Sequence, residues 1–467
     1  MVSIRSVTAH SLSFVPDTVL WLRRDLRLAD LPALGAAHEA ADGSSVLPLF
    51  VLDRRLWDGA GAVRRAWLNA SLRALDSRYD GALVVRVGDP AQVVPEVARE
   101  VGATSVHVSA ESTPFGRRRD EAVRRALGEQ DCALEATGTA YAVGPGTLTT
   151  GGGTPYQVFT PFSRAWRAHG WPQPAPVPKQ LRWVRRVESQ DLPLLDGEVP
   201  DLPPAGEEAA LERWHAFLED GLADYADTRD RPDLAGTSGL SAHLKFGEVH
   251  PRTLLADVAV HPDHRKAGPQ TFVTELAWRE FYADVLWHRP DSAWADLKPS
   301  LKGMAYDEPG EGFEAWKAGR TGYPMVDAGM RQLLAEGWMH NRVRMIVASF
   351  LVKDLHVWWP HGARHFMAHL CDGDIASNSH GWQWAAGTGT DASPYFRVFN
   401  PVTQGRKFDP DGDYVRRYVP ELAHVRGGAV HEPWKVDGAY DHGYPEPILD
   451  HAEAREEALR RYEAVKG

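Results

Sequence analysis

The chain has 467 residues, of which 43% are hydrophobic and 25% are charged, so it is long enough for two or three domains that each bury a core. Its formal net charge of −11 argues against nonspecific coating of nucleic acid, so any DNA site must be a local basic patch. The sequence has no membrane-spanning apolar run and no signal-peptide pattern, which predicts a cytoplasmic protein, most simply a monomer. Its two cysteines, Cys132 and Cys371, are far apart, so neither a disulfide nor a metal site is expected.

Short apolar runs alternate with helical patterns from residue 18 to about residue 139. The runs are TVLWL, SVLPLFVL, ALVVRV and SVHVS. This alternation predicts a Rossmann-like α/β domain over residues 1–139, with a parallel sheet covered by helices. The first strand continues into Arg23 and Arg24 without a G-x-G-x-x-G sequence, which argues against a dehydrogenase-like nucleotide domain.

Residues 140–206 are rich in glycine, threonine and proline. This composition predicts an interdomain linker that wraps over the surface instead of packing as an element, although GTPYQVFTPFSRAW alone fits a turn and a short helix. Long helical patterns replace the strands afterwards, which predicts an all-helical domain over residues 207–467.

The helical region opens with Tyr225 and the loop GTSGLSAHLKFGEV. The backbone N–H groups and hydroxyls of such a loop are able to hold phosphate, although most such loops are only turns. On the helix that follows, an acid, a base and two aromatic residues fall on one face, at Glu275, Trp278, Arg279 and Tyr282. This face fits either the wall of a pocket or an amphipathic surface with a Glu–Arg pair.

Residues 337–384 combine aromatic, basic and acidic side chains at unusual density. The apolar spacing from Asn341 onward predicts a helix to about residue 355, which puts Arg344 on the same side as Asn341. Asp372 and Asp374 flank a glycine in a predicted turn. They fit a pair of hydrogen-bond acceptors, a cap for the following helix, or, less favourably, ligands for a divalent metal.

Several of these stretches together resemble one family of proteins. They are WLRRDLRLADLPAL near the start, the GTSGLSAHLKFGEV loop, WMHNRVRMIVASFLVKDL, and the run from CDGD through GWQWAAGTGTDASPYFR. From about Val19 to Trp434 the chain resembles the photolyase and cryptochrome family, in particular its class I cyclobutane pyrimidine dimer (CPD) photolyases. Two departures are Leu31, where asparagine is more usual, and Gly239, where some members have arginine.

The resemblance implies FAD in the helical domain, damaged DNA containing pyrimidine dimers as the partner, and light-driven repair as the activity. It implies that Arg344 pairs with Asp372 beside the flavin and that Asn378 faces the reactive ring nitrogen. The residues implied for FAD are Tyr225, Thr237, Ser238, Gly239, Leu240, Ser241, Arg279, Asn341, Arg344, Phe366, Asp372, Gly373, Asp374 and Asn378. Those implied for the damaged base pair and DNA are Glu275, Trp278, Tyr282, Asn341, Arg342, Met345, Trp384 and Arg397.

Two further sets of residues follow from the same resemblance. Electrons are expected to reach the flavin through Trp382 and Trp359 from Tyr306, which stands where relatives have tryptophan and would lose its phenol proton when oxidised. The α/β domain is expected to carry an antenna chromophore of the 8-hydroxy-5-deazaflavin type, with FMN or methenyltetrahydrofolate as alternatives. Its candidate residues are Arg24, Phe50, Glu111 and Lys245.

Three rival functions remain open from the sequence. A (6-4) photolyase is disfavoured because Met345 stands where its chemistry needs a histidine. A cryptochrome-type signalling protein is disfavoured by the complete pocket residues and by the lack of a low-complexity tail after the last helical pattern. A flavin-binding scaffold protein would lack repair activity.

Overall fold

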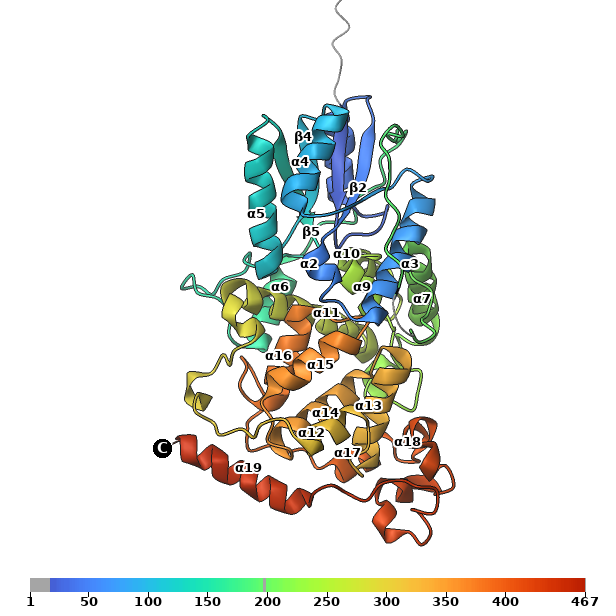
Figure 1. Cartoon of the computed structure of the whole chain (residues 1–467), viewed down its shortest axis with the longest axis vertical. Helices are drawn as coiled ribbons and strands as arrows, with labels where there is room; N and C mark the ends of the chain where they lie inside the picture. The colour runs from blue at the N-terminus through green and yellow to red at the C-terminus, as the bar shows by residue number, and fades with distance from the viewer. Residues whose placement is uncertain (1–16, 196–198, 467) are drawn as a thin grey trace, which may run out of the picture.

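The computed structural model describes residues 17–195 and 199–466. The start of the expected α/β domain and three residues of the expected linker therefore lie outside the described residues. An α/β part forms one end of the molecule and a helical part forms the other, with α19 (His451–Lys466) at the far end of the helical part (Figure 1). This arrangement confirms the predicted fold class.

In the described residues the α/β part contains a five-stranded parallel sheet with strand order β3-β2-β1-β4-β5. The strands are β1 (Thr18–Leu22), β2 (Val46–Leu52), β3 (Val84–Val87), β4 (Ser105–Ala110) and β5 (Ala133–Thr139). The helices are α1 (Pro32–Ala41), α2 (Arg54–Trp57), α3 (Ala62–Arg78), α4 (Pro90–Val101) and α5 (Pro114–Gly128). The order of the strands and the helices between them match the doubly wound arrangement predicted by the alternating pattern.

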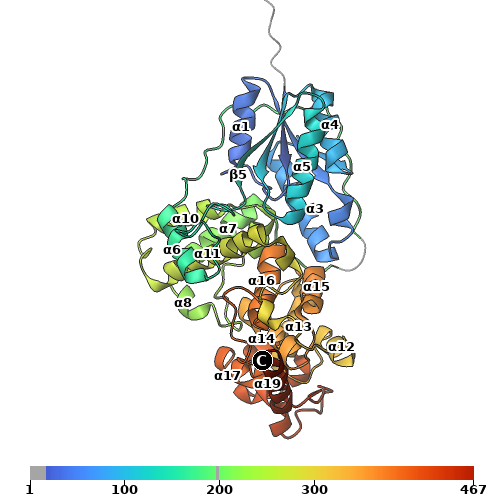
Figure 2. The same cartoon turned by 90° about the vertical axis from the view of Figure 1, so that its left-hand side faces the viewer.

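Both faces of this sheet are buried. Leu20 and Leu22 point into a core shared with α1 and α3, whereas Val19 and Trp21 point into a core shared with α4 and α5. Figure 2 shows α1 on one side of the sheet and α4 and α5 on the other. The strands are nearly continuous apolar runs because each of their faces meets a helical layer.

The expected linker contains a packed element, so the prediction that it only wraps over the surface was wrong for this part. Helix α6 (Phe159–His169) packs against α11 (Ala267–His288). Phe162 and Trp166 are buried in the core of the helical part, and Trp166 Nε1 donates to Glu280 at 2.7 Å. The aromatic residues of α6 fall on one face, and burying that face stabilises a packed helix even though the composition around it is typical of a loop.

The remaining helices form the helical part around a core shared by α13, α14, α15 and α16. They are α7 (Glu207–Asp220), α8 (Tyr225–Thr228), α9 (Ser241–Phe246), α10 (Pro251–Val260), α12 (Glu311–Lys317), α13 (Pro324–Glu336), α14 (Asn341–Lys353), α15 (Trp359–His369), α16 (Ile375–Ala386), α17 (Pro401–Phe408) and α18 (Asp413–Tyr418). The described ranges also hold short 3-10 helices at Pro290–Ala293, Pro299–Leu301, Pro420–Leu422, Gly427–His431 and Pro433–Lys435. Within residues 17–195 and 199–466, none of the helices has the length and apolarity needed to span a bilayer.

The two parts approach each other closely beside the helices that carry the site. Gly247, after α9, has a φ of +70° and lies against the backbone of Arg24, whose carbonyl oxygen would be 1.9 Å from a Cβ at this position. Gly61, at the start of α3, lies equally close to the backbone of Ala368 in α15. These contacts need glycine, and they bring the loop after β1 next to the end of α9 and the start of α3 next to α15.

Candidate functional site

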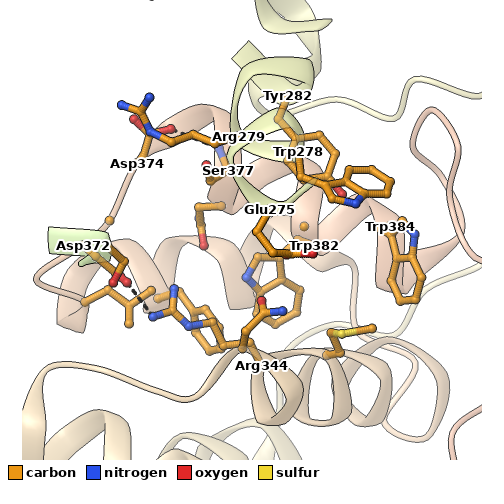
Figure 3. A pocket seen from close by; sticks show the side chains of 18 of the residues that line it. Glu275, Trp278, Arg279, Tyr282, Arg344, Asp372, Asp374, Ser377, Trp382 and Trp384 are labelled. Carbon is orange, nitrogen blue, oxygen red and sulfur yellow. Dashed lines mark hydrogen bonds and ion pairs between the residues drawn. The ribbon is translucent and has the colours of Figure 1, made fainter. Parts of the chain in front are cut away.

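A cavity of about 460 Å³ opens between α11, α14 and α16 (Figure 3). It lies within the usual size range of ligand and cofactor sites. Many residues expected from the sequence line it together: Ser241, Glu275, Trp278, Arg279, Tyr282, Asn341, Arg342, Arg344, Met345, Phe366, Asp372, Gly373, Asp374, Asn378, Trp382 and Trp384. Residues far apart in the chain thus converge on one cavity.

Other expected residues lie away from the cavity wall. Of the phosphate-loop candidates Ser241 lines it, whereas Tyr225, Thr237, Ser238, Gly239 and Leu240 do not. Tyr225 and Leu240 are buried in the core beneath the loop. Gly239 has a φ of +63°, a backbone conformation that favours glycine over residues with a side chain.

Arg344 and Asp372 form an ion pair on one side of the cavity. Arg344 Nη2 lies 2.7 Å from Asp372 Oδ2, and Arg344 Nε donates to the carbonyl oxygen of Met339 at 2.8 Å. The Asp372 side chain is 3% exposed, and its Oδ1 has no hydrogen-bond partner among the described residues. A buried carboxylate oxygen without a partner is costly, so Oδ1 is positioned to accept a hydrogen bond from a bound ligand.

Asp374 both caps a helix and lines the cavity. Its Oδ1 accepts from the backbone N–H groups of Ala376 and Ser377 at 3.0 and 3.1 Å, so the capping alternative is realised. Its Oδ2 lies 2.5 Å from Nη2 of Arg24, which reaches over from the α/β part. Burial alone would raise the pKa of Asp374, but Arg24 and Lys245 hold it well below its usual range. Among the described residues, no group of three or more histidine, cysteine, aspartate or glutamate side chains is arranged to hold a metal.

Three of the four antenna candidates lie close together where the two parts meet. Arg24 Nε donates to the carbonyl oxygen of Lys245 at 3.4 Å, and Arg24 Nη1 lies 3.9 Å from Glu111 Oε1. Their role in holding an antenna chromophore stays a prediction. Lys245 lines the first cavity, and burial, with a smaller effect from Arg24, lowers its pKa to about 7. Arg24 pairs with Asp374 where the two parts meet, and Phe50 is buried in the core beside the sheet. Arg24 and Glu111 line one small pocket beside the loop after β1, and Glu111 also lines a second cavity, of about 720 Å³, beside α5 and the end of α11.

The second side of the first cavity is formed by α11. Glu275 Oε1 lies 2.5 Å from Arg229 Nη1, while Arg279 donates to the carbonyl oxygens of Ala140 and Leu244 at 3.0 and 3.2 Å. The surface Glu–Arg pair considered for this helix is therefore not formed. Burial raises the pKa of Glu275, and this effect outweighs the opposing influence of Arg229.

Trp278 is held in place by a residue of the expected linker. Its ring stacks on Phe159 with 3.6 Å between ring centroids and 6° between ring planes, and Tyr282 flanks it at 5.4 Å. Figure 3 shows Trp278 and Trp384 near each other, across the cavity from Asp372. The sequence analysis missed Phe159 and Arg229, because nothing local in the sequence connects them with α11.

The aromatic residues expected to carry electrons extend away from the cavity. Trp382 lines the cavity and contacts Phe366 and Trp316, with ring centroids 4.9 and 6.1 Å away. Trp359 is fully buried. The hydroxyl of Tyr306 is also buried and has no hydrogen-bond partner among the described residues, which does not fit the expected loss of its proton to water or a nearby base.

The two arginines expected to contact DNA differ in their surroundings. Arg342 forms a two-point ion pair with Asp230, with its closest contact at 2.8 Å, and lies over the ring of Phe408. Arg397 is exposed and forms no ion pair within the described part of the chain. To bind a DNA phosphate, Arg342 must therefore give up or share its ion pair with Asp230, whereas Arg397 can bind one without breaking such a pair.

Comparison with known proteins agrees with this geometry. Residues 18–179 match the family model described as DNA photolyase, and residues 272–464 match that of the FAD binding domain of DNA photolyase. A curated protein from Streptomyces griseus named deoxyribodipyrimidine photo-lyase is 44% identical over 468 residues, with 96% of this chain and 99% of that protein covered. The chain therefore belongs to the DNA photolyase family, and its helical part contains the family's FAD-binding domain.

Two solved structures are similar over nearly the whole chain. A bacterial class III photolyase from Agrobacterium tumefaciens matches with a TM-score of 0.91 and 38% identity, covering 99% of this chain and 100% of that one. A cryptochrome from Synechocystis matches with a TM-score of 0.86 and 27% identity, covering 95% of this chain and 99% of that one. Photolyase and cryptochrome activities thus occur on closely similar folds.

Proposed function

We propose that this chain binds FAD in the first cavity and uses blue light to repair cyclobutane pyrimidine dimers in DNA. The observation that carries the proposal is that one cavity has two chemically different walls. The Arg344–Asp372 pair and Asp374 form a polar wall, and Trp278, Trp384 and Met345 contribute to an aromatic and apolar region. The names of the curated relatives support the same reaction.

The polar wall suits a flavin dinucleotide. Asp372 Oδ1 is free to accept a hydrogen bond, and Asn378 adds an amide at the cavity wall. Arg279 and Arg344 supply positive charge for phosphate groups or for an anionic ring, and Lys245, whose pKa is lowered to about 7 by burial, adds to it in its protonated form. These groups favour an anionic ligand that also offers a hydrogen-bond donor to a carboxylate.

The other wall suits a base pair turned out of the duplex. When bound, reduced FAD supplies an electron under blue light and receives it back after repair. Trp278 and Trp384 offer ring faces to the dimer, and Phe159 holds Trp278 in its orientation. In its protonated form Glu275 donates a hydrogen bond to a thymine carbonyl as negative charge develops on the dimer. The reaction opens the two carbon–carbon bonds that join the pyrimidines, with no net oxidation or reduction.

Purified protein provides the direct test of this function. Protein reduced with dithionite should restore the thymine absorption of a dimer-containing oligonucleotide in blue light and not in the dark. FAD binding without repair would instead favour the cryptochrome alternative, which the Synechocystis neighbour keeps open. Repair of (6-4) lesions in place of dimers would contradict the role given to Met345.

Arg397 is expected to contact DNA phosphate. Arg397→Ala should weaken binding to all dimer-containing duplexes alike and reduce the slope of log affinity against log salt by about one unit. A titration at several salt concentrations measures both quantities. Arg73→Ala, which removes an exposed arginine of α3 outside both cavities, serves as the control. Unchanged affinity and slope in Arg397→Ala would show that Arg397 is only a solvated surface residue.

The second chromophore, class I membership, the cytoplasmic location and the monomeric state remain predictions. A deazaflavin-type antenna stays the favoured choice, and the second cavity, with Glu111, Arg117 and Trp287 in its wall, is large enough to be considered for it. Reconstitution with a deazaflavin, FMN or methenyltetrahydrofolate, followed by measurement of energy transfer to FAD, distinguishes the three. Tight binding of the folate alone would contradict the favoured choice.

A further inference from the structure

The outer end of the expected electron path contains a carboxylate that the sequence did not single out. We propose that Asp296 accepts the indole proton of oxidised Trp359, so that the path ends at Trp358, Trp359 and Asp296 and not at Tyr306. The inference rests on the proposed function, because the oxidant is a light-excited, oxidised flavin in the first cavity.

The path begins at the cavity wall. Trp382 lines the cavity and packs against α15 at Gly362, where a Cβ would lie only 2.2 Å from Trp382 Cη2. Trp359 begins α15, about one turn before Gly362, and is fully buried in the same core. The tight packing at Gly362 therefore keeps Trp382 close to the helix that carries Trp359.

Asp296 accepts hydrogen bonds from the two outer indoles. Its Oδ1 accepts from Trp359 Nε1 at 2.6 Å and from Trp358 Nε1 at 3.4 Å. The two indole rings lie 6.4 Å apart between centroids, and Trp358 is partly exposed whereas Trp359 is not. In the described ranges no lysine or arginine forms an ion pair with Asp296. Its charge is therefore not neutralised by a cation in an ion pair and acts on these indoles, where a negative charge stabilises a positive one.

The proposed step conserves electrons and protons. Trp382 gives one electron to the excited flavin, and Trp359 returns one electron to Trp382. The Nε1–H bond of oxidised Trp359 then breaks, an O–H bond forms on Asp296, and a neutral indolyl radical remains. Because that radical carries no charge, the electron is less strongly drawn back from the flavin. A thiol in solution supplies one electron through the partly exposed Trp358, and Asp296 returns the proton to Trp359 Nε1. The thiol proton passes to water, which leaves a thiyl radical in solution.

The neighbouring aromatic residues lack such an acceptor or lack access to solvent. The Tyr306 hydroxyl is buried with no partner among the described residues, and burial, followed by the charge of Asp296, raises its pKa well above the usual range. Trp316 is fully buried, and its Nε1 donates to the backbone carbonyl of Val347 at 3.0 Å. Both indoles at Asp296 are hydrogen-bonded to its carboxylate, and of the two Trp358 is also partly exposed.

Asp296→Asn tests the step because asparagine keeps a hydrogen-bond acceptor and removes the negative charge. After a blue pulse on protein loaded with oxidised FAD, transient absorption of the wild type should show a tryptophan cation that becomes a neutral indolyl radical, more slowly in D₂O. In Asp296→Asn the cation should persist, the solvent isotope effect should disappear, and the separated charges should recombine faster by about tenfold. Asp291→Asn, which removes an exposed carboxylate paired with Arg289, should behave as the wild type.

Two further readouts separate this inference from the proposed function. Bound FAD per chain and dimer repair by dithionite-reduced wild type report on the proposed function, and a chain that takes up no FAD would overturn both. If FAD binds and repair proceeds, a wild-type spectrum that ends in a tryptophan cation or a tyrosyl radical would overturn the role of Asp296 alone. A neutral indolyl radical formed equally fast in Asp296→Asn would overturn it as well.

Discussion

Replacing Arg344 with alanine should release FAD from the purified protein. The change leaves the Asp372 carboxylate, which is 3% exposed, without its ion-pair partner beside the bound flavin. Breaking a buried ion pair by removing one partner costs about 3 kcal/mol or more, which corresponds to a loss of about a hundredfold in FAD affinity. The ratio of flavin to protein absorbance after purification, and a fluorescence titration with FAD, measure the effect.

Arg342→Ala provides the matched control on the same helix. Arg342 pairs with Asp230, whose side chain is 36% exposed, so water replaces the lost partner and FAD retention should change little. Melting of both apoproteins should be compared to exclude a general loss of folding. Full FAD content in Arg344→Ala would mean that the Arg344–Asp372 pair does not hold the flavin.

Replacing Glu275 with alanine should reduce the quantum yield of dimer repair while FAD content stays unchanged. Glu275 lies on the α11 wall with Trp278, away from Asp372. Loss of one hydrogen bond to a developing charge lowers the yield by about tenfold. Glu275→Gln keeps N–H donors, so its repair yield should fall less than that of Glu275→Ala. Equal repair by wild type and Glu275→Ala with saturating substrate would remove Glu275 from the mechanism.

The pH dependence of repair tests the same role. Burial raises the pKa of Glu275, and the donor is the protonated acid, which is present below that pKa and lost as the pH rises through it. Repair by the wild type should therefore decline with rising pH, whereas repair by Glu275→Gln should stay flat over the same range. A decline of equal size in both proteins would show that a different group titrates.

The sequence by itself determined the fold class and most of the cavity wall. A short apolar run is a local feature, so the runs around Leu20 and Phe50, alternating with helical patterns, predicted the sheet without knowledge of the contacts between distant residues. The four side chains on one face of α11, including Glu275 and Tyr282, follow from helix geometry, and all of them do line the cavity. The Arg344–Asp372 pair came from similarity to a family and not from spacing.

Only the tertiary structure decided how these elements support one another. Arg24 pairs with Asp374 across 350 residues, and Phe159 stacks on Trp278 from a segment whose composition reads as a loop. The short contact of Asp296 with Trp359 likewise depends on how two distant segments pack. Such contacts leave no periodic pattern, because each depends on the three-dimensional meeting of surfaces and not on the spacing of residues along one element.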